Sequence, residues 1–451
     1  MELFKAGCEP QDIQMMFKMN ENTVIEVETP CGTTEKATVG EIVKQGTILG
    51  PTLCCVSTDQ IIGESQERCI GKEYMAILIF VDDVMSAGNP NDARRAIRNF
   101  KEMEHMKKFT YGLKKTKYLV MKTGKEEEEE IDEEVNMGKV SRTKEYKYVG
   151  FHLNEEGNCL YHIEKKDQQI QGQITALKSI ANYFNLGPLF VQIRLELYNS
   201  CIIPSLLYGL ETWHKLTRKE VKNLETIQRK ALCQLLELPR STPYIGLLSE
   251  LGMWRIEERL DYRRIMFLQN LLKSDDKRLC KRIVINQRDS EEEGTFYDTT
   301  KEKLEKYNID LEVENMTKSE LKKKVKDKID QRMGEIIEKA AKNMTKLHFI
   351  TEPKLERKEY INETDGMECL HTLKTRLNML PIYANYKGDL TLDRICTHCN
   401  KEEDKTEHLL ECEALGNTVL KREDLQNTNN TELWKLMNER TRFNIRCRAK
   451  K

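Results

Sequence analysis

The chain has 451 residues, of which 39% are hydrophobic and 33% charged, so it holds enough apolar side chains for a sizeable core. Its 73 lysines and arginines face 74 aspartates and glutamates, which excludes a chain that is basic throughout and makes any basic surface local. Only 10 prolines and 23 glycines are present, which excludes collagen and a dominant low-complexity chain.

The first part of the chain alternates short strands with helices. Runs of alternating or continuous apolar residues predict strands, and apolar positions at helical spacing predict helices. In chain order we expect a helix over residues 10–19, a strand–turn–strand unit over 23–43, a buried strand over 75–81, a helix over 91–108, a strand over 118–121 and a strand pair over 146–153. Residues 125–134 hold eight acids, whose mutual repulsion predicts a solvated loop.

From about residue 160 the pattern becomes helical. Apolar positions at helical spacing predict helices over residues 165–185, 189–210, 217–237 and 250–273. Residues 274–345 are rich in lysine and glutamate and poor in aromatic residues. This composition fits either long exposed helices or a partly disordered linker.

The sequence predicts neither a membrane span nor a secretory signal. The longest strongly apolar run, residues 75–81, is far shorter than the roughly 20 residues that a membrane-crossing helix needs. The first residues lack the basic region, apolar core and cleavage site of a signal peptide. Most of the 14 cysteines are scattered, as in a reduced intracellular protein. We therefore expect a protein of the cytoplasm, the nucleus or both, with no membrane partner.

A pair of aspartates follows the apolar run, in Phe80-Val81-Asp82-Asp83. Such a pair at the end of a buried strand is costly unless a cation neutralises it, and hard divalent cations prefer carboxylate oxygens. Two metal ions about 3.5–4 Å apart stabilise the attacking and leaving oxygens in phosphoryl transfer. The pair therefore indicates part of a two-metal site or, since Asp-Asp is a common dipeptide, a surface turn or a helix N-cap.

Other segments in a fixed order place this pair in a wider context. Together they resemble the palm of a reverse transcriptase, and specifically that of non-LTR (LINE-type) retrotransposons. The matching segments are Gln45-Gly46 to Gly50-Pro51, similar to motif B; Phe80 to Asp83, similar to motif C; Lys114 to Lys117, similar to motif D; and Tyr148-Val149-Gly150, similar to the start of the primer grip. Downstream, Leu206 to Trp213, Leu238-Pro239 and Leu251-Gly252 resemble the helical thumb and connection of these elements.

The resemblance implies an RNA-directed DNA polymerase that acts on an RNA template and a DNA primer or target, with deoxynucleoside triphosphates and Mg²⁺. It implies no specific protein partner. The roles it implies are metal ligation by Asp82 and Asp83, protonation of pyrophosphate by Lys115, and contacts with nucleotide, template or primer by Gln45, Gly46, Tyr148 and Gly150.

The chain departs from the family before motif B. A two-metal polymerase takes carboxylates from two strands, and motif A of the family supplies the earlier aspartate. Here Asp12 is the one aspartate before Gln45, and it lies on the predicted 10–19 helix rather than after a strand. We therefore expect an N-terminally truncated polymerase whose 451 residues alone are inactive. The alternative is a catalytically dead nucleic-acid-binding remnant or a truncated gene model.

Two sets of residues in the predicted thumb can have either a structural or a functional role. We expect Tyr208 and Trp213 to be core aromatics. The basic residues of the predicted 217–237 helix either line a groove for a nucleic-acid backbone or form a solvated face, and they are Lys219, Lys222, Arg229 and Lys230.

A second constellation lies near the C-terminus, where Cys396 and Cys399 are followed by His408 and Cys412. Two nearby thiolates can hold one cation on a turn, and a histidine and a cysteine four residues apart share a helix face and complete a tetrahedron. The spacing predicts a Zn²⁺ site rather than random clustering or a disulfide, which a reducing compartment disfavours. It also resembles the Cys-Cys-His-Cys motif of the same family, although the last spacing is one residue shorter than usual.

These patterns together predict an α+β protein. We expect a partial polymerase palm, an antiparallel sheet with helices, followed by a helical thumb and a small zinc-knuckle-like unit. The expected boundaries are 1–158 for the partial palm, 159–273 for the helical thumb, 274–366 for a charged helical or linker region, and 367–451 for the zinc-knuckle-like region with its basic tail.

Overall fold

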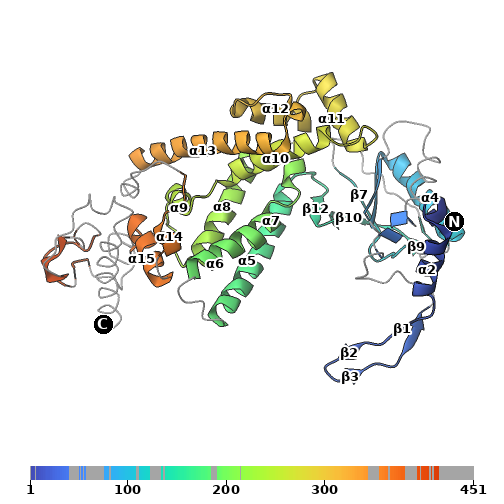
Figure 1. The fold of residues 1–451 in the computed structure, drawn as a ribbon, viewed down its shortest axis with the longest axis horizontal. Helices are drawn as coiled ribbons and strands as arrows, with labels where there is room; N and C mark the ends of the chain where they lie inside the picture. Colours follow the sequence, from blue (N-terminus) through green and yellow to red (C-terminus); the bar gives the residue numbers. More distant parts are fainter. Residues whose placement is uncertain are drawn as a thin grey trace. The chain divides into compact units, whose positions relative to one another are not determined.

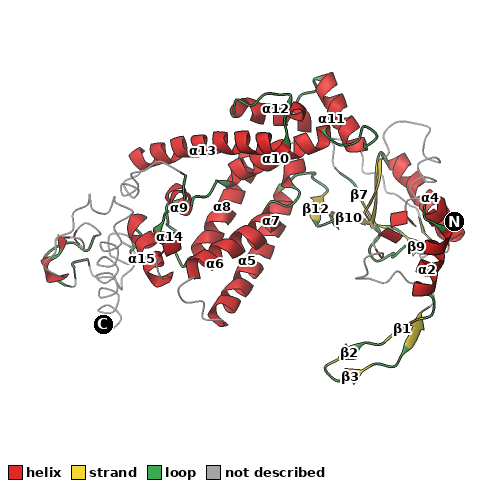
Figure 2. Ribbon diagram, viewed as in Figure 1, coloured by secondary structure: helices red, strands yellow, loops and turns green. Residues whose placement is uncertain are grey.

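The computed structural model describes residues 2–5, 7–39, 50, 52–53, 55–56, 76–80, 83–107, 111–121, 134–135, 138–183, 190–213, 215–343, 355–363, 366–380, 394–396, 398–405, 408 and 411–415. The chain forms two compact units, Met1–Tyr161 and His162–Lys451, whereas the sequence predicts the first boundary at residue 158. Helices dominate, with small two-stranded sheets in the first unit, so the fold is mixed α and β as expected (Figure 2). No helix in the described ranges is both long and apolar enough to cross a bilayer.

The first unit begins with two helices and a two-stranded arm. α1 (Glu2–Lys5) precedes α2 (Pro10–Asn20), which starts with a proline. Proline is tolerated there because the first N–H groups of a helix have no partner within the helix. β1 (Thr23–Ile25) pairs antiparallel with β4 (Ala37–Val39), and β2 (Glu28–Thr29) pairs with β3 (Gly32–Thr33) at the tip (Figure 1). The prediction of helix, strand, turn and strand over residues 10–43 is confirmed for the residues described.

A hairpin and a helix follow. β5 (Ala76–Phe80) and β6 (Asp83–Ala87) pair antiparallel with Phe80 opposite Asp83, so two residues connect them. We expected a buried strand, but Leu78 is 41% exposed, because β5 has a single partner strand among the described residues. α4 (Pro90–Lys107) begins one residue earlier than predicted, since the side chain of Asn89, rather than Asn91 or Asp92, accepts a hydrogen bond from the helix.

The remaining strands of the first unit correct the expected sheet. β8 (Glu134–Val135) pairs with β9 (Gly138–Lys139), and β11 (Glu145–Tyr148) with β12 (Phe151–Asn154), both antiparallel. However, β7 (Lys117–Leu119) and β10 (Ser141–Thr143) pair in parallel, which a tight turn cannot join. The described strands thus make six two-stranded sheets, not one antiparallel sheet. Most of the predicted acidic loop, 125–134, lies outside the described residues.

The second unit is mainly helical in its described part. Its first helices are α5 (Leu160–Tyr183), α6 (Phe190–Leu197), α7 (Ile203–Leu206), α8 (Arg218–Leu235), α9 (Tyr244–Leu251) and α10 (Ile256–Leu272), with a π-helical turn at Tyr198–Ile202 between α6 and α7. The predicted 250–273 helix is divided because Gly252 has φ +61, which ends α9. A Cβ atom at position 252 would also lie 2.4 Å from the backbone nitrogen of Arg357, which is a steric clash, so only glycine fits.

α10 organises the core of this unit. It contacts α8 and three further helices, α11 (Leu279–Ser290), α12 (Phe296–Lys306) and α13 (Lys318–Asn343) (Figure 1). Residues 274–343 are therefore packed helices, and the expected boundary at residue 273 falls inside one hydrophobic core. α13 buries only one narrow stripe, which explains its charged composition, and the stripe consists of Leu321, Val325, Ile329, Met333 and Ile337.

A buried ion pair joins α9 to the chain that follows α13. α14 (Tyr360–Glu363) and α15 (Gly366–Arg376) carry its partners. The Arg376 guanidinium donates from Nε to Glu250 Oε2 at 2.6 Å and from Nη2 to Oε1 at 2.8 Å. The Tyr360 hydroxyl donates to Oε2 at 2.7 Å. Both charged side chains are almost fully buried, so this fork fixes α15 against α9.

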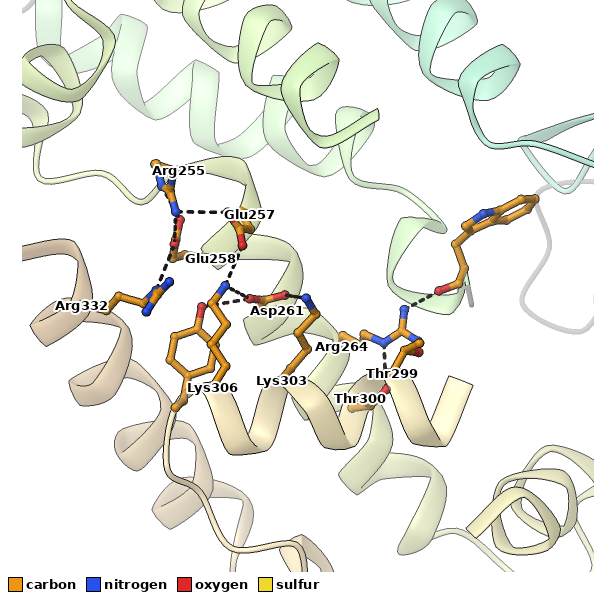
Figure 3. A network of polar contacts seen from close by, with 12 residues as sticks. Arg255, Glu257, Glu258, Asp261, Arg264, Thr299, Thr300, Lys303, Lys306 and Arg332 are labelled. Atoms are coloured by element: carbon orange, nitrogen blue, oxygen red, sulfur yellow. Dashed lines mark hydrogen bonds and ion pairs between the residues drawn. The ribbon is translucent and has the colours of Figure 1, made fainter. Parts of the chain in front are cut away.

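Charged side chains also connect α10 with α12 and α13 (Figure 3). The Lys306 ammonium of α12 lies 2.7 Å from both Glu257 and Asp261 of α10. Asp261 also accepts from the Tyr307 hydroxyl at 3.0 Å and faces Lys303 at 3.7 Å. Burial alone would lower the pKa of Lys306, but Asp261 and Glu257 raise it on balance. This ammonium therefore stays charged between α10 and α12.

Replacing Lys306 with methionine should destabilise the second unit by about 2 kcal/mol, because Asp261 is buried and would lose its nearest cation. Burial would raise the pKa of Glu257, yet Lys306 lowers it on balance, so this contribution is present above the unfolded pKa of about 4.3. It is lost as the pH falls through the folded pKa. Urea unfolding at pH 7 and pH 3.5 measures both effects. Lys301→Met, on the exposed face of α12, should change little at either pH, and equal losses for the two variants would contradict the prediction.

Candidate functional site

The residues predicted for catalysis lie on three segments of the first unit. Asp83 is the first residue of β6 and is exposed. Lys115 lies in an exposed turn before β7, and Tyr148 is the last residue of β11. Gly150 follows in the turn to β12. The other predicted residues, Asp82, Gln45 and Gly46, lie outside the described residues.

Two tyrosines of β11 bring these segments together. The Tyr146 hydroxyl donates to the backbone carbonyl of Lys115 at 3.1 Å, and the Tyr148 hydroxyl makes a long hydrogen bond of 3.5 Å to the carbonyl of Leu78 on β5. Burial, and then the negative charge of Asp83, raises the pKa of both tyrosines. Tyr146 therefore holds the Lys115 turn against β11, Tyr148 holds β5 against β11, and both protonated phenols lie within the electrostatic influence of Asp83.

Tyr146 was missed among the candidate site residues. The signal lies in the alternation Tyr146-Lys147-Tyr148, because residues two apart on a strand share one face. The strand then reverses through a two-residue turn, with Tyr148 opposite Phe151. Gly150 has φ +81 and suits this turn, whereas Val149 has φ +44, which is strained for a β-branched residue. Such strain persists where the surrounding structure holds it in place.

The described part of this site offers one carboxylate. Asp12, the one aspartate before Gln45, lies exposed on α2, as the sequence predicts. Among the described residues, no group of three or more metal-ligating side chains includes Asp83. A single aspartate is too few ligands for two divalent cations, so the two-metal chemistry would need Asp82 and at least one more carboxylate.

The predicted cysteine and histidine cluster does come together. One ligand atom from each of Cys396, Cys399, His408 and Cys412 lies within 4.8 Å of all the others. Cys396 Sγ is 3.9 Å from Cys412 Sγ, and Cys399 Sγ is 3.2 Å from His408 Nε2. A tetrahedral Zn²⁺, with bonds of about 2.3 Å to sulfur and 2.0 Å to nitrogen, sets its ligands about 3.5–3.8 Å apart. These four side chains are close enough to bind one metal ion.

A short hairpin positions the first two cysteines. Ile395 and Glu403 form an antiparallel bridge, and the Cys396 N–H donates to the carbonyl of Glu402 at 2.7 Å. The N–H of Lys401 then points to Cys399 Sγ at 3.4 Å. A backbone N–H directed at sulfur favours the thiolate, which is the form that binds metal.

A carboxylate orients the histidine. His408 Nδ1 lies 3.1 Å from Glu402 Oε2, while Nε2 faces Cys399. A proton on Nδ1 therefore satisfies Glu402 and leaves the lone pair of Nε2 for a metal, an arrangement typical of histidine ligands. Glu402 was not predicted, because only the hairpin places it beside a histidine six residues further along the chain.

The thiols themselves indicate a cation site. Burial alone would raise the pKa of Cys399, but the N–H groups of Lys401 and Glu402 and the His408 ring lower it to about 6. Burial, and then the neighbouring Cys396, raises the pKa of Cys412 to about 11. Three clustered thiolates repel one another, and a bound cation removes that repulsion. This donor set of three sulfurs and one nitrogen suits zinc.

No family model matches this sequence, and no curated protein matches it. The function is therefore inferred from the residues of the chain and their arrangement.

Proposed function

We propose that this chain is part of the reverse transcriptase of a non-LTR retrotransposon, an RNA-directed DNA polymerase that copies RNA onto a DNA primer. The observation that carries the proposal is that β11 contacts both the Lys115 turn and β5, the strand that leads to Asp83, through two tyrosines. The segments similar to motif C, motif D and the primer grip lie apart in sequence, yet Tyr146 and Tyr148 connect them. If the Asp-Asp pair were only a surface turn, we would not expect the motif D and primer-grip segments to lie beside it.

Asp82 and Asp83 would hold Mg²⁺ in this proposal. Bound Mg²⁺ supplies charge stabilisation for nucleotidyl transfer. The protonated phenols of Tyr146 and Tyr148 keep β11 against the hairpin without adding negative charge near Asp83. Lys115 is exposed beside them, where its ammonium is available to give a proton to the leaving pyrophosphate. Zn²⁺ at the Cys396 cluster would have a purely structural role.

A second candidate is a nucleic-acid-binding remnant without catalysis. The exposed position of Asp12 in the first turn of α2 favours it, because this carboxylate lies on a helix and not at the end of a strand. The two candidates differ in whether Asp83 binds metal. Neither assigns the chain to a membrane, and both place its work in the cytoplasm or nucleus, where RNA and DNA are found.

Iron-mediated cleavage tests the metal site without requiring turnover. Fe²⁺ takes the place of Mg²⁺, and with ascorbate and peroxide it cuts the protein backbone next to its ligands. We expect cleavage near residues 82–83 that excess Mg²⁺ suppresses and that Asp83→Asn abolishes. Asp12→Asn is the matched control and should cleave normally. Equal cleavage near residues 82–83 in the unmutated chain and in Asp83→Asn would reject the polymerase proposal and favour the non-catalytic remnant.

Primer extension by the 451 residues alone should give no detectable product with Mg²⁺ or Mn²⁺, because one pair of adjacent aspartates cannot hold both ions. A labelled DNA primer on an RNA template provides the assay. Extension that depends on both Asp83 and Asp12 would contradict this expectation and make Asp12 the second ligand. Extension that persists in Asp83→Asn would come from a contaminating polymerase.

A further inference from the structure

α10 carries three arginines at intervals of four residues, so they share one side of the helix. Arg255, at its N-cap, pairs with three glutamates, of which Glu258 is nearest at 2.5 Å. Arg263, two turns further along, pairs with Glu211. Arg259 lies between them, and no carboxylate of the described residues pairs with it. One of three similarly placed cations therefore lacks an anion.

The Arg259 side chain is partly buried. Its Nε atom is shielded from solvent and has no hydrogen-bond partner in the described ranges. Burial lowers the pKa of Arg259, and the groups that counteract this are the phenols of Tyr198 and Tyr244, not a carboxylate. A guanidinium stays protonated even so, and a cation that loses hydration without gaining an anion is unfavourable.

A second polar group without a partner lies in the same region. Tyr198 is fully buried, and its hydroxyl makes no hydrogen bond within the described part of the chain. Burial raises the pKa of Tyr198 on balance, against the charge of Arg259 and the amide of Gln228, so both groups lie near the phenol. The Gln228 amide is already engaged, because it accepts from the Tyr244 hydroxyl and donates to the Trp254 carbonyl at 3.3 Å. Tyr198 thus keeps an unused donor near an unpaired cation.

The backbone at this tyrosine is also unusual. Tyr198 begins the π-helical turn Tyr198–Ile202, in which the N–H of Ile203 donates to the carbonyl of Tyr198. Pro204 follows and has no N–H to donate, which favours a departure from regular α-helix here. Turns of this kind occur frequently at functional sites. The helix is therefore widened at the residue that carries the unpartnered hydroxyl.

We propose that Arg259 and Tyr198 form a binding site for one small oxyanion of the phosphate class. A guanidinium matches an oxyanion with two parallel N–H bonds, and the phenol adds a third donor. Because Tyr198 is fully buried and Arg259 partly buried, the ligand is a small ion rather than the backbone of a polymer. Glu225 is the acid near Tyr244, and Arg255 already pairs with it at 3.9 Å. The site lies in the second unit and does not rest on the polymerase proposal.

Equilibrium dialysis of the full chain against labelled inorganic phosphate, without added Mg²⁺, tests the site. We expect about one phosphate per chain, displaced by sulfate but not by the same concentration of chloride. Arg259→Met should abolish binding. Tyr198→Phe should weaken it by about 10- to 100-fold, because it removes one hydrogen bond to a charged group. Arg282→Met removes an exposed arginine of α11 and is the matched control, which should bind phosphate normally.

Urea unfolding in phosphate-free buffer separates a ligand site from a structural role. Arg259→Met should be at least as stable as the unmutated chain, because it removes a charge that has no partner, whereas Arg255→Met strands its glutamates and should lose stability. Phosphate should then raise the unfolding midpoint of the unmutated chain and of Arg282→Met more than that of Arg259→Met. Three results would overturn the proposal: equal losses of stability in Arg259→Met and Arg255→Met without phosphate, equal phosphate binding by Arg259→Met and Arg282→Met, or no bound phosphate at millimolar concentration.

Discussion

Replacing Cys399 with serine should remove one equivalent of zinc from the purified protein and unfold the hairpin that carries Cys396 and Cys399. Among the described residues of the hairpin, one bridge forms, between Ile395 and Glu403, and both of these residues are exposed. Such a short segment cannot bury enough apolar surface to offset its ordering, so the metal must supply the free energy. Structural zinc supplies roughly 10–16 kcal/mol in small zinc-binding peptides. The loss should be large locally and leave the α10 core folded.

Elemental analysis and hydrogen exchange measure the two parts of this prediction. Protein prepared without chelator should contain about one zinc per chain, and Cys399→Ser about none. Cys280→Ser, an exposed cysteine on α11, is the matched control and should keep the metal. Amide exchange should accelerate at Cys396 and Asp404 and stay slow in α10 and α13. Less than about half an equivalent of zinc in the unmutated chain would mean that these four residues are not a zinc site.

Replacing Arg376 with methionine should destabilise the second unit by about 3–5 kcal/mol. The change leaves the Glu250 carboxylate fully buried, with the Tyr360 hydroxyl still donating to it. Burial, and then the negative charge of Glu250, raises the pKa of Tyr360 well above its usual value, so this phenol cannot replace the lost cation. An uncompensated buried charge costs more than the pair itself contributed. Denaturant unfolding followed by circular dichroism measures the change.

A double substitution separates the buried charge from the lost packing. Arg376→Met/Glu250→Leu removes both charges and should recover most of the stability, since a buried ion pair contributes little relative to apolar residues of similar volume. The surface pair of Lys342 and Glu338, 2.6 Å apart on α13, provides the matched control. Lys342→Met should cost no more than about 0.5 kcal/mol. A double variant as unstable as Arg376→Met would show that packing, rather than charge, holds α15.

The sequence by itself determined the local elements with strong signals. Pro10 predicted the start of α2, and the apolar and aromatic positions of residues 146–153 predicted the β11–β12 pair. The spacing of Cys396, Cys399, His408 and Cys412 predicted the metal cluster. These signals lie within a few residues of the feature they predict. A proline at N1, a period of two and a ligand spacing each act through local geometry, so a single sequence contains them.

Only the tertiary structure decided which distant segments meet. The charged composition of residues 274–343 predicted exposed helices or a disordered linker. Only one stripe of α13 is apolar, and the structure shows that this stripe packs in the core that includes α10. The Tyr146 hydroxyl bonds to the backbone of Lys115, which lies 31 positions earlier in the chain. Glu250 pairs with Arg376, which lies 126 positions later. Tyr208, expected in the core, is 42% exposed in the turn after α7 (Ile203–Leu206). Long-range pairing depends on how whole helices and strands pack, and neither composition nor periodicity records that packing.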